Sequence, residues 1–428
     1  MAVLAVFLLS VPVRAGVPLA GMGGVGTGVA SSTGDIADNP AASSVNLRRH
    51  EGAFSAGASY LRLVFSGNAL NPSERTTSAF YSANPLSWSM VTPVLGSGRG
   101  RLGAGSWQLD RRELQLKEKL DLSMASSPGG QPLSTDFFSG LSRMKQDESL
   151  YAHGISWIQP VFGGDHIISL GGALITQSSQ ETLLVTAEPL TVEGVDVNLR
   201  EVQRRREMYG AGLTLGWHFR PVPGGSIGAG LLYAGKMSGK IWEVSDGGPL
   251  LADGITRSPQ IRFSAGGSFS LFDAMTAALD LRYCSGVKTE ETLFGGTPSA
   301  WKYAENSDAV FSMAVGGEYR IRIDEYQVPL RIGFFTKPDA VPARSAGTVP
   351  VSSVKELDAP PFRQDLMGVT AGVGFESGQV RADLAAAWLV VNSPVSSAGA
   401  TGEVESGDAR NSLGIYLSIS SKFGGMPE

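Results

Sequence analysis

Few residues in this chain have the types and the spacing that catalysis or metal binding requires. The single cysteine, Cys284, cannot form an internal disulfide or build a thiolate metal site, and the four histidines are scattered without ligand spacing. Residues 21–26 read G-x-G-x-x-G, but a dinucleotide-binding fingerprint needs a strand before it and a helix after it. Residues 224–228 read G-x-S-x-G, but they lead into a strand pattern, so we expect no nucleophile elbow. The sequence therefore predicts no metal site, no cofactor and no nucleotide site.

His153 keeps one enzymatic interpretation open. It falls on an apolar strand face with Tyr151, Ile155 and Trp157. A histidine there could act with a serine of a neighbouring strand, as in an outer-membrane lipase. Alternatively, its amphipathic ring belongs to the girdle that borders a membrane-facing surface. We expect the protein not to be an enzyme, with the lipase as an alternative.

Arginines gather on strand faces that alternate with apolar faces. Arg262, Arg282 and Arg320 are candidate ligand-binding residues, because a guanidinium pairs bidentately with a carboxylate. Further charged residues share these faces: Arg322, Arg331, Arg381, Asp280, Glu318 and Asp383. The alternative is that these charges pair with one another.

An apolar patch follows residues 134–136, which read Ser-Thr-Asp and could cap a helix. Phe137, Phe138, Leu141 and Met144 have helical spacing, which predicts a short amphipathic helix on an external loop. These four residues are candidates for the first contact with an apolar ligand. They could equally pack the loop onto the barrel rim.

The elements that would position these residues alternate with a period of two. In residues 211–219, for example, Leu213, Leu215 and Trp217 share one face, and small or polar residues occupy the other. The second face holds mainly glycine, serine and alanine, which favours the crowded lumen of a transmembrane antiparallel barrel over the wet face of a soluble sandwich. About fourteen strands are expected, roughly at 52–66, 84–95, 100–120, 149–161, 165–185, 204–220, 224–243, 257–271, 274–289, 308–323, 325–336, 364–376, 378–391 and 411–423.

Composition agrees with a long all-β membrane protein. Glycine supplies 55 of 428 residues, charged residues only 18%, and the mean hydropathy is +0.03. No stretch approaches the ~20 consecutive apolar residues of a membrane helix. The net charge of −5 leaves no electrostatic footprint for nucleic acid.

The N-terminal part divides into two predicted segments before the barrel, which we place at 49–428. Residues 1–15 contain an apolar run and a small-x-small cleavage site, which predict a secretory signal peptide. Residues 16–48 are glycine-rich without clear periodicity, and we expect them to form a hatch inside the lumen. Gly23 and Gly26 would let the backbone pass through a narrow space, and Asn39 before Pro40 favours a turn.

The run of glycines from Gly21 to Gly28, followed by Asn39-Pro40-Ala41, resembles the hatch of the long-chain fatty-acid and aromatic-hydrocarbon transporters of Gram-negative outer membranes. That resemblance implies a plugged fourteen-stranded barrel that moves hydrophobic compounds by passive diffusion. Related plugged barrels serve secretion systems, so a barrel that shuttles or anchors partner proteins is an alternative, as is a general porin.

The last predicted strand carries a further signal. Residues 412–419 (SLGIYLSI) resemble the pattern polar-x-Gly-x-x-apolar-x-apolar, and the strand closes on Phe423. Such strands are recognised by the barrel-assembly machinery of bacterial outer membranes, which is therefore an expected partner. Lipid and lipopolysaccharide are the other expected partners, the latter through phosphates near Arg204, Arg205 and Arg206.

Overall fold

The computed structural model describes the barrel strands and a few residues of the N-terminal segment. The described residues are 22, 25–27, 39–42, 49–66, 75–94, 100–123, 137–189, 197–245, 251–272, 274–293, 301–338, 366–391, 395–399, 402–406 and 410–425. The predicted signal peptide, residues 1–15, lies outside them.

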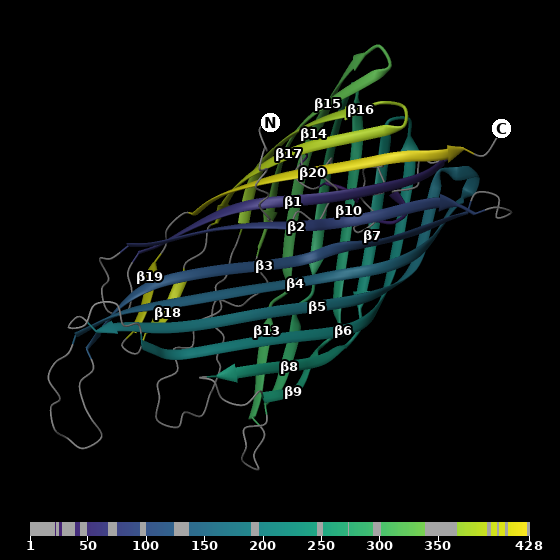
Figure 1. Ribbon diagram of the computed structural model, residues 1–428. Coiled ribbons are helices and arrows are strands. Elements are labelled where there is room, and N and C mark those ends of the chain that lie inside the picture. Colours follow the sequence, from purple (N-terminus) through teal and green to yellow (C-terminus); the bar gives the residue numbers. More distant parts are fainter. Residues whose placement is uncertain are drawn as a thin grey trace, which may run out of the picture.

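The chain forms a closed antiparallel β-barrel of 14 strands, which confirms the predicted fold class (Figure 1). Ten strands are single elements: β1 (Arg49–Ser66), β2 (Arg75–Pro93), β3 (Arg101–Ser123), β4 (Phe137–Val161), β5 (His166–Pro189), β6 (Val197–Val222), β15 (Tyr326–Lys337), β16 (Leu366–Glu376), β17 (Val380–Val391) and β20 (Arg410–Gly425). Four are interrupted once: β7 (Gly225–Ala234) with β8 (Met237–Ser245), β9 (Leu251–Arg257) with β10 (Gln260–Leu271), β11 (Met275–Cys284) with β12 (Val287–Leu293), and β13 (Trp301–Ser307) with β14 (Val310–Ile323).

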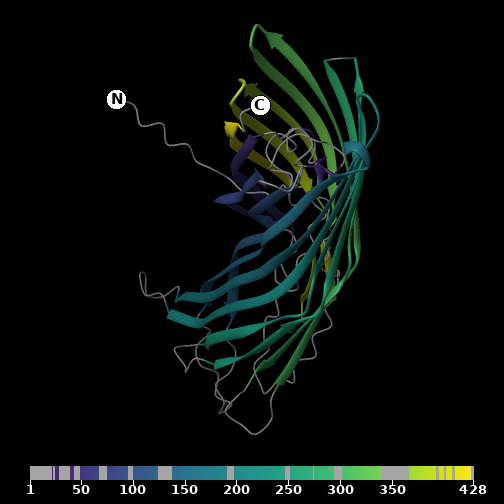
Figure 2. The same cartoon turned by 90° about the vertical axis from the view of Figure 1, so that its right-hand side faces the viewer.

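Consecutive strands pair around the whole barrel, and the first strand closes it against the last. β1 pairs with β2 on one side and with β20 on the other, where Gly57 lies opposite Tyr416. The wall curves round to enclose a lumen (Figure 2). A separate hairpin, β18 (Val395–Gly399) with β19 (Gly402–Ser406), lies between β17 and β20 in sequence.

One end of the barrel is built from short turns. Residues 162–165 join β4 to β5, and they include the 3-10 turn η3 (Phe162–Gly164). Gly164 and Gly224 adopt φ of 106° and 79° in these turns, a region that glycine occupies without steric cost. Phe162 and Phe272 are 81% and 88% exposed at the same end, where they extend the outer apolar surface.

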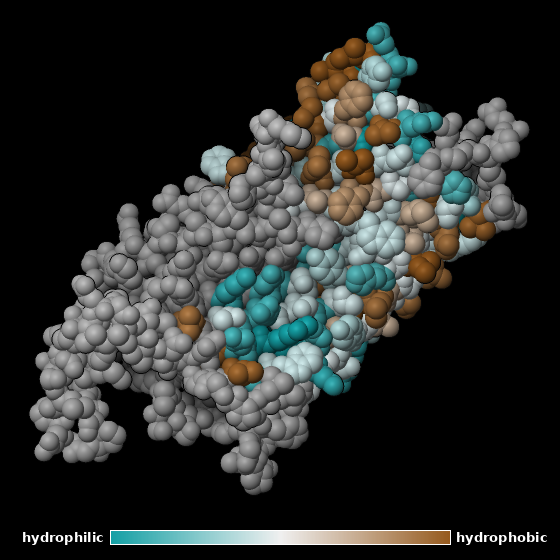
Figure 3. All heavy atoms as spheres, in the orientation of Figure 1, coloured by the Kyte–Doolittle hydropathy of each residue, from teal (hydrophilic) through white to brown (hydrophobic). Residues whose placement is uncertain are grey.

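The outer face carries an apolar belt of the length that a bilayer requires. On β6, Tyr209 and Phe219 are ten residues apart, and a tilted membrane strand needs about 9–11 residues. Leu213 and Leu215, between them, are 56% and 44% exposed. Figure 3 shows hydrophobic residues toward the short-turn end of this face, and hydrophilic residues nearer the other end. The alternation follows from having lipid outside and packed lumen inside.

The four strand interruptions mark one border of this belt. At three of the four breaks a serine hydroxyl accepts a hydrogen bond from a backbone N–H: Ser285 Oγ from Ile261 at 2.9 Å, Ser258 Oγ from Lys288 at 2.8 Å, and Ser307 Oγ from Val287 at 3.0 Å. The large exposed apolar residues of these strands lie on β7, β10, β11 and β14; among residues of described exposure, none lies on β8, β9, β12 or β13. The breaks therefore coincide with the membrane–water boundary opposite the short turns. Among the described residues, no helix is long and apolar enough to cross a membrane.

Candidate functional site

The described part of the N-terminal segment is buried and bonded to the inside of the barrel wall. The backbone N–H groups of Gly26 and Thr27 both donate to Asp280 Oδ2, at 2.6 and 2.8 Å. Asp280 belongs to β11, where the register places it opposite Ala314 and Gly266, and its exposure is 0%. A carboxylate that accepts two backbone N–H groups is a strong anchor, because charge-assisted hydrogen bonds are about twice as strong as neutral ones.

Asn39 forms a second anchor through its side-chain amide. Its Nδ2 group donates to the carbonyl of Thr27 at 3.0 Å and to the carbonyl of Trp217 in β6 at 2.8 Å. Its Oδ1 accepts from the Ala41 N–H at 3.0 Å, and its carbonyl accepts from the Ala42 N–H at 3.1 Å. Residues 39–42 thus form the turn that Asn-Pro favours, and Asn39 ties that turn both to the earlier hatch residues and to the wall.

Glycines of the wall allow this close approach. A Cβ atom on Gly228 would lie 1.9 Å from the Thr27 carbonyl oxygen, and one on Gly316 would lie 2.1 Å from the Met22 carbonyl oxygen. A Cβ atom on Gly216 would lie 2.5 Å from Asn39 Oδ1. These glycines come from the paired strands β6 and β7 and from β14, which lies three strands farther round the wall.

The structure describes three of the four predicted hatch residues. Gly26, Asn39 and Pro40 are buried inside the barrel, as a hatch requires, whereas Gly23 lies outside the described residues. That 16–48 as a whole forms the plug stays a prediction. Asp280 and the wall glycines 216, 228 and 316 were not recognised as hatch contacts, because the sequence shows only that the inward faces are rich in small residues.

An apolar cluster lines the lumen beside the hatch. Its buried members are Ala41, Val91, Trp107, Leu109, Leu150, Ala152, Ile158, Ile167, Ile175, Met208, Leu232, Ala234, Met237 and Ile255. Ala41 comes from the hatch turn, and the others come from the inner faces of β2 through β9. The signal in the sequence is a local loss of alternation, as in Leu231-Leu232-Tyr233, which makes both faces of a strand apolar.

Polar contacts cross the lumen near this cluster. A register shift in β3 lies between Gln108 and Asp110, at the position of Leu109. Arg262 of β10 donates through Nη1 to the Leu109 carbonyl at 2.9 Å, and Lys337 of β15 pairs with Asp110 at 3.0 Å. Since β3, β10 and β15 are far apart around the barrel, these two contacts brace opposite walls at the bulge.

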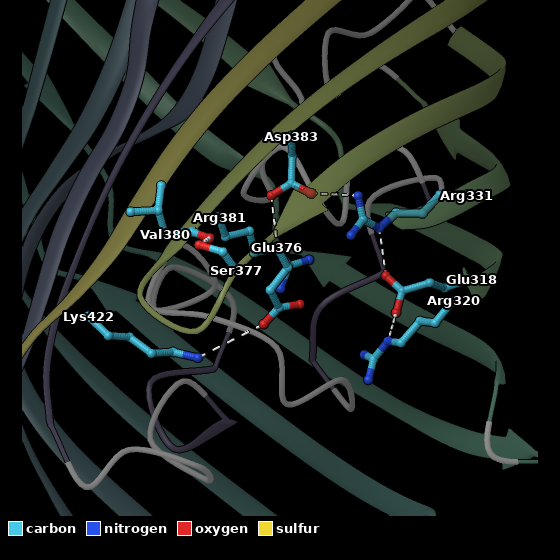
Figure 4. Close-up of polar contacts among 9 residues, drawn as sticks. All are labelled: Glu318, Arg320, Arg331, Glu376, Ser377, Val380, Arg381, Asp383 and Lys422. Carbon is cyan, nitrogen blue, oxygen red and sulfur yellow. Dashed lines mark hydrogen bonds and ion pairs between the residues drawn. The ribbon is translucent and has the colours of Figure 1, made fainter. Parts of the chain in front are cut away.

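The predicted inward arginines form a chain of ion pairs near the short-turn end (Figure 4). Glu318 accepts from Arg320 Nε and Arg331 Nε, each at 2.6 Å, and Asp383 accepts from Arg331 Nη1 at 2.7 Å. Asp383 also accepts from Arg381 Nε at 2.9 Å. The side chain of Arg331 is 1% exposed, so its charge is compensated by two carboxylates in a dry environment.

The candidate ligand arginines therefore all have protein partners in the structure. Arg320 belongs to the chain with Glu318, Arg282 lies 3.4 Å from Asp280, and Arg262 bonds to the Leu109 carbonyl. This arrangement corresponds to the alternative in which the luminal charges pair with one another. A ligand role for these three residues stays a prediction.

The predicted amphipathic helix is wrong. Residues 137–144 form the start of β4, which pairs with β3 on one side and with β5 on the other. Pairing with a strand on each side provides backbone hydrogen-bond partners for the segment, which overrides a short helical pattern of apolar residues. A strand places positions 137 and 141 on one face and positions 138 and 144 on the other. The side chains of Phe137, Phe138, Leu141 and Met144 lie outside the described part, and their role in ligand contact is untested.

His153 lies on the outer face and has partners that suit a structural role. Its Nε2 is 3.2 Å from Thr176 Oγ1, and its ring stacks on Tyr151 with centroids 6.2 Å apart. This agrees with the girdle interpretation. No cluster of His, Cys, Asp and Glu that could hold a metal ion exists among the described residues.

The three consecutive arginines of β6 separate by strand alternation. Arg204 pairs with Glu243 at 2.7 Å and Arg206 with Glu291 at 2.8 Å, and these two side chains are mostly buried. Burial alone would lower the pKa of Arg204, but Glu243, Glu181 and Glu291 together raise it above its usual value. Arg205 points outward, with 66% of its side chain exposed.

A closed barrel with an apolar outer belt and an N-terminal segment bonded into its lumen defines a plugged barrel of the outer-membrane type. Solved structures with this fold cover nearly the whole chain. The toluene transporter TbuX of Ralstonia pickettii is 14% identical, with a TM-score of 0.52, over 98% of this chain and 100% of that chain. A FadL homologue of Pseudomonas aeruginosa is 13% identical, with a TM-score of 0.58, over 98% and 100%.

A third structure, a mutant of the monoaromatic hydrocarbon channel TodX, is 14% identical, with a TM-score of 0.60, over 96% of this chain and 100% of that chain. No family model and no curated protein sequence matches the chain. At these identities the likeness establishes the fold. The fold implied by the resemblance in the glycine-rich segment and the Asn-Pro-Ala motif is therefore confirmed.

Proposed function

We propose that this protein lets hydrophobic compounds, such as long-chain fatty acids or aromatic hydrocarbons, diffuse passively across the outer membrane of a Gram-negative bacterium. The observation that carries the proposal is the apolar luminal cluster packed against the hatch turn at Ala41. A lumen for hydrophilic solutes would be wet and polar, whereas the inner wall of this one carries buried apolar side chains, which would meet a hydrophobic solute once the hatch moves. The solved structures with the same fold include proteins described as toluene transporters.

The hatch contacts suit a plug that can shift. Asp280 of the wall accepts from the Gly26 N–H of the hatch, and Asn39 of the hatch donates to a backbone carbonyl of the wall. Gly228 and Gly316 let the hatch chain lie directly on the wall. Hydrogen bonds of this kind contribute on the order of 1–3 kcal/mol each, so a small displacement can break them while the barrel ladder stays intact. A solute that reaches the cluster would then pass when the hatch moves.

Three alternatives are less well supported. A general porin needs an open aqueous lumen, but the buried cluster and the contacts of Arg262 and Lys337 occupy this one. The lipase interpretation needs a serine beside His153, whereas the hydroxyl that His153 contacts is that of Thr176, on the exposed outer face. A barrel that shuttles or anchors proteins would need a partner surface, whereas the luminal cluster offers a site for a small apolar solute.

The remaining partners follow from the membrane setting. We propose that the barrel-assembly machinery recognises β20, whose outward Leu413, Leu417 and Ile419 are 44–52% exposed, and that lipopolysaccharide contacts the outer rim. We retain the start of β4, with Phe137 and Phe138, as the proposed first contact for an apolar ligand. Each of these three proposals can fail without affecting the transport function.

The transport proposal is tested by uptake into liposomes that contain the purified protein. Toluene and a fluorescent long-chain fatty acid should enter faster than into protein-free liposomes, while a hydrophilic disaccharide should not. Rapid entry of the disaccharide would indicate a porin. Equal entry of the apolar probes with and without the protein would refute transport of these compounds.

A further inference from the structure

Exposed cations lie on the outer face at the outer border of the apolar belt. Lys236 occupies the break between β7 and β8, and Lys240 lies on β8 opposite Glu207 of β6. Arg205 lies farther along β6, opposite Trp242, and its guanidinium is 5.8 Å from the centre of that ring. All three residues are exposed on the surface that continues from the lipid-facing belt.

The side chains of the two lysines have no ion-pair or hydrogen-bond partner among the described residues, unlike the neighbouring cations of β6 and β12. Arg205 is paired with Glu207, which also accepts from Tyr209 Oη at 3.4 Å. Lys288 of β12, on the same outer face, is paired with Glu290 at 2.7 Å. The side chains of Arg204 and Arg206 point inward to carboxylates. The outward charges of Arg205, Lys236, Lys240 and Glu207 therefore sum to +2, and the excess lies on the two lysines.

The heights of the two lysines follow from the strand register. Tyr209 marks the belt border on β6, and in the register of β6 with β8 it lies opposite Ser238. Lys240 is two residues beyond Ser238. With a rise of about 3.3 Å per residue and a tilt of about 45°, its Cα lies roughly 5 Å above the border. The head-group region is about 5–7 Å thick on each side, so the ammonium of Lys240 ends within it. Lys236 lies two residues on the belt side of Ser238, roughly 5 Å below the border, and its four-carbon stem can carry the ammonium up to the head groups.

We propose that Lys236 and Lys240 form a binding site for the phosphate groups of the outer-leaflet glycolipid, lipopolysaccharide. The proposal rests on the proposed outer-membrane location, which places this rim in the leaflet that carries phosphorylated glycolipid. Two ammonium groups on residues four apart in the sequence provide charge and donors for phosphate oxygens, and the adjoining apolar belt provides the surface for the acyl chains. Arg205 and Tyr209 border the site but are already bonded to Glu207.

The test measures binding of bisphosphorylated lipid A to the purified full-length protein in detergent. Each lysine near an anionic membrane surface contributes a factor of roughly five, so Lys236→Gln with Lys240→Gln should weaken binding about 25-fold. Lys288→Gln is the matched control, because it removes a charge at the same level that is already paired; it should change the affinity by less than about twofold. Lipid A without phosphates should bind the wild type and the double variant equally.

Unchanged affinity of the double variant, or an equal loss in Lys288→Gln, would overturn the site. A protein that keeps its heat-modifiable gel mobility and its apolar-probe uptake while giving that result refutes the lipid site alone. A protein that fractionates away from the outer membrane refutes instead the location on which both proposals depend.

Discussion

Replacement of Gly316 by alanine tests directly whether the hatch rests on the wall. The added Cβ atom would lie 2.1 Å from the Met22 carbonyl oxygen and 2.7 Å from its carbonyl carbon. To reach an ordinary contact of 3.4 Å, the backbone must move by 1.3 Å, the difference between 3.4 and 2.1 Å. The added Cβ atom would belong to a β-strand and would meet the main chain of Met22, so no flexible side chain could move aside to relieve the contact. Overpacking of this kind costs about 1–3 kcal/mol.

That cost falls on the docked state of the hatch alone. The ratio of displaced to docked hatch should therefore rise by a factor of about 5 to 150, since each 1.4 kcal/mol is tenfold. In planar bilayers, Gly316→Ala should show a correspondingly higher open probability than the wild type. Gly228→Ala, whose Cβ atom would lie 1.9 Å from the Thr27 carbonyl oxygen, should behave in the same way.

The matched control is the neighbouring residue. Gly317 lies on the other face of β14, and a Cβ atom there would meet only the Thr276 carbonyl oxygen at 3.8 Å. Gly317→Ala should thus leave the open probability unchanged while making the same chemical change in the same strand. Heat-modifiable mobility checks that all three variants form barrels. Equal conductance of Gly316→Ala, Gly317→Ala and the wild type would refute the argument that the hatch seals the lumen by close contact with glycine.

Three further outcomes follow from the site. Asp280→Asn should raise the open probability by about tenfold, because the charge assistance to the Gly26 and Thr27 N–H groups is lost; unchanged gating would show that other contacts hold the hatch. Phe137→Ser combined with Phe138→Ser should weaken binding of a fluorescent fatty acid by about tenfold or more, since each large apolar group contributes roughly 1.5–3 kcal/mol; normal binding would reject the first-contact proposal. Arg320→Ala should leave that first binding unchanged, and a loss of binding would instead place the arginine in the encounter site.

The sequence was sufficient for the barrel because lipid and lumen impose opposite demands on alternate residues. On β14, Met313 and Val315 are 46% and 48% exposed, whereas Ala314 between them is 1% exposed, as the period of two predicts. At the breaks in β7–β8 and β9–β10 the inward positions shift by one residue, from Ala234 to Met237 and from Ile255 to Gln260, and the strand then continues with the same partners. The strand count could therefore be predicted even though the breaks were not.

The helix prediction failed where the alternation is weak. The apolar residues Phe137, Phe138, Leu141 and Met144 satisfy helical spacing. Beyond the bilayer both faces of β4 meet water or protein, so this part of the strand lacks the strict alternation that indicates a strand. Pairing with β3 and β5 decides the conformation there, and pairing over long sequence distances is not visible in a local window. The same limit explains why Gly216, Gly228 and Gly316 could not be separated from the other wall glycines.

The way in which the hatch is held also explains how a plug and a passage can exist in one lumen. Among the described residues, the wall holds the hatch through hydrogen bonds at Asp280 and at the Trp217 carbonyl, supported by close contact at glycines. Side-chain ion pairs such as Arg331 with Glu318 and Asp383 join wall strand to wall strand instead. The strong buried pairs thus stabilise the barrel, while the hatch depends on backbone contacts that short movements can break. A solute that arrives at the apolar cluster needs to displace only the backbone contacts of the hatch. The hatch can therefore move while the ion pairs of the wall stay intact.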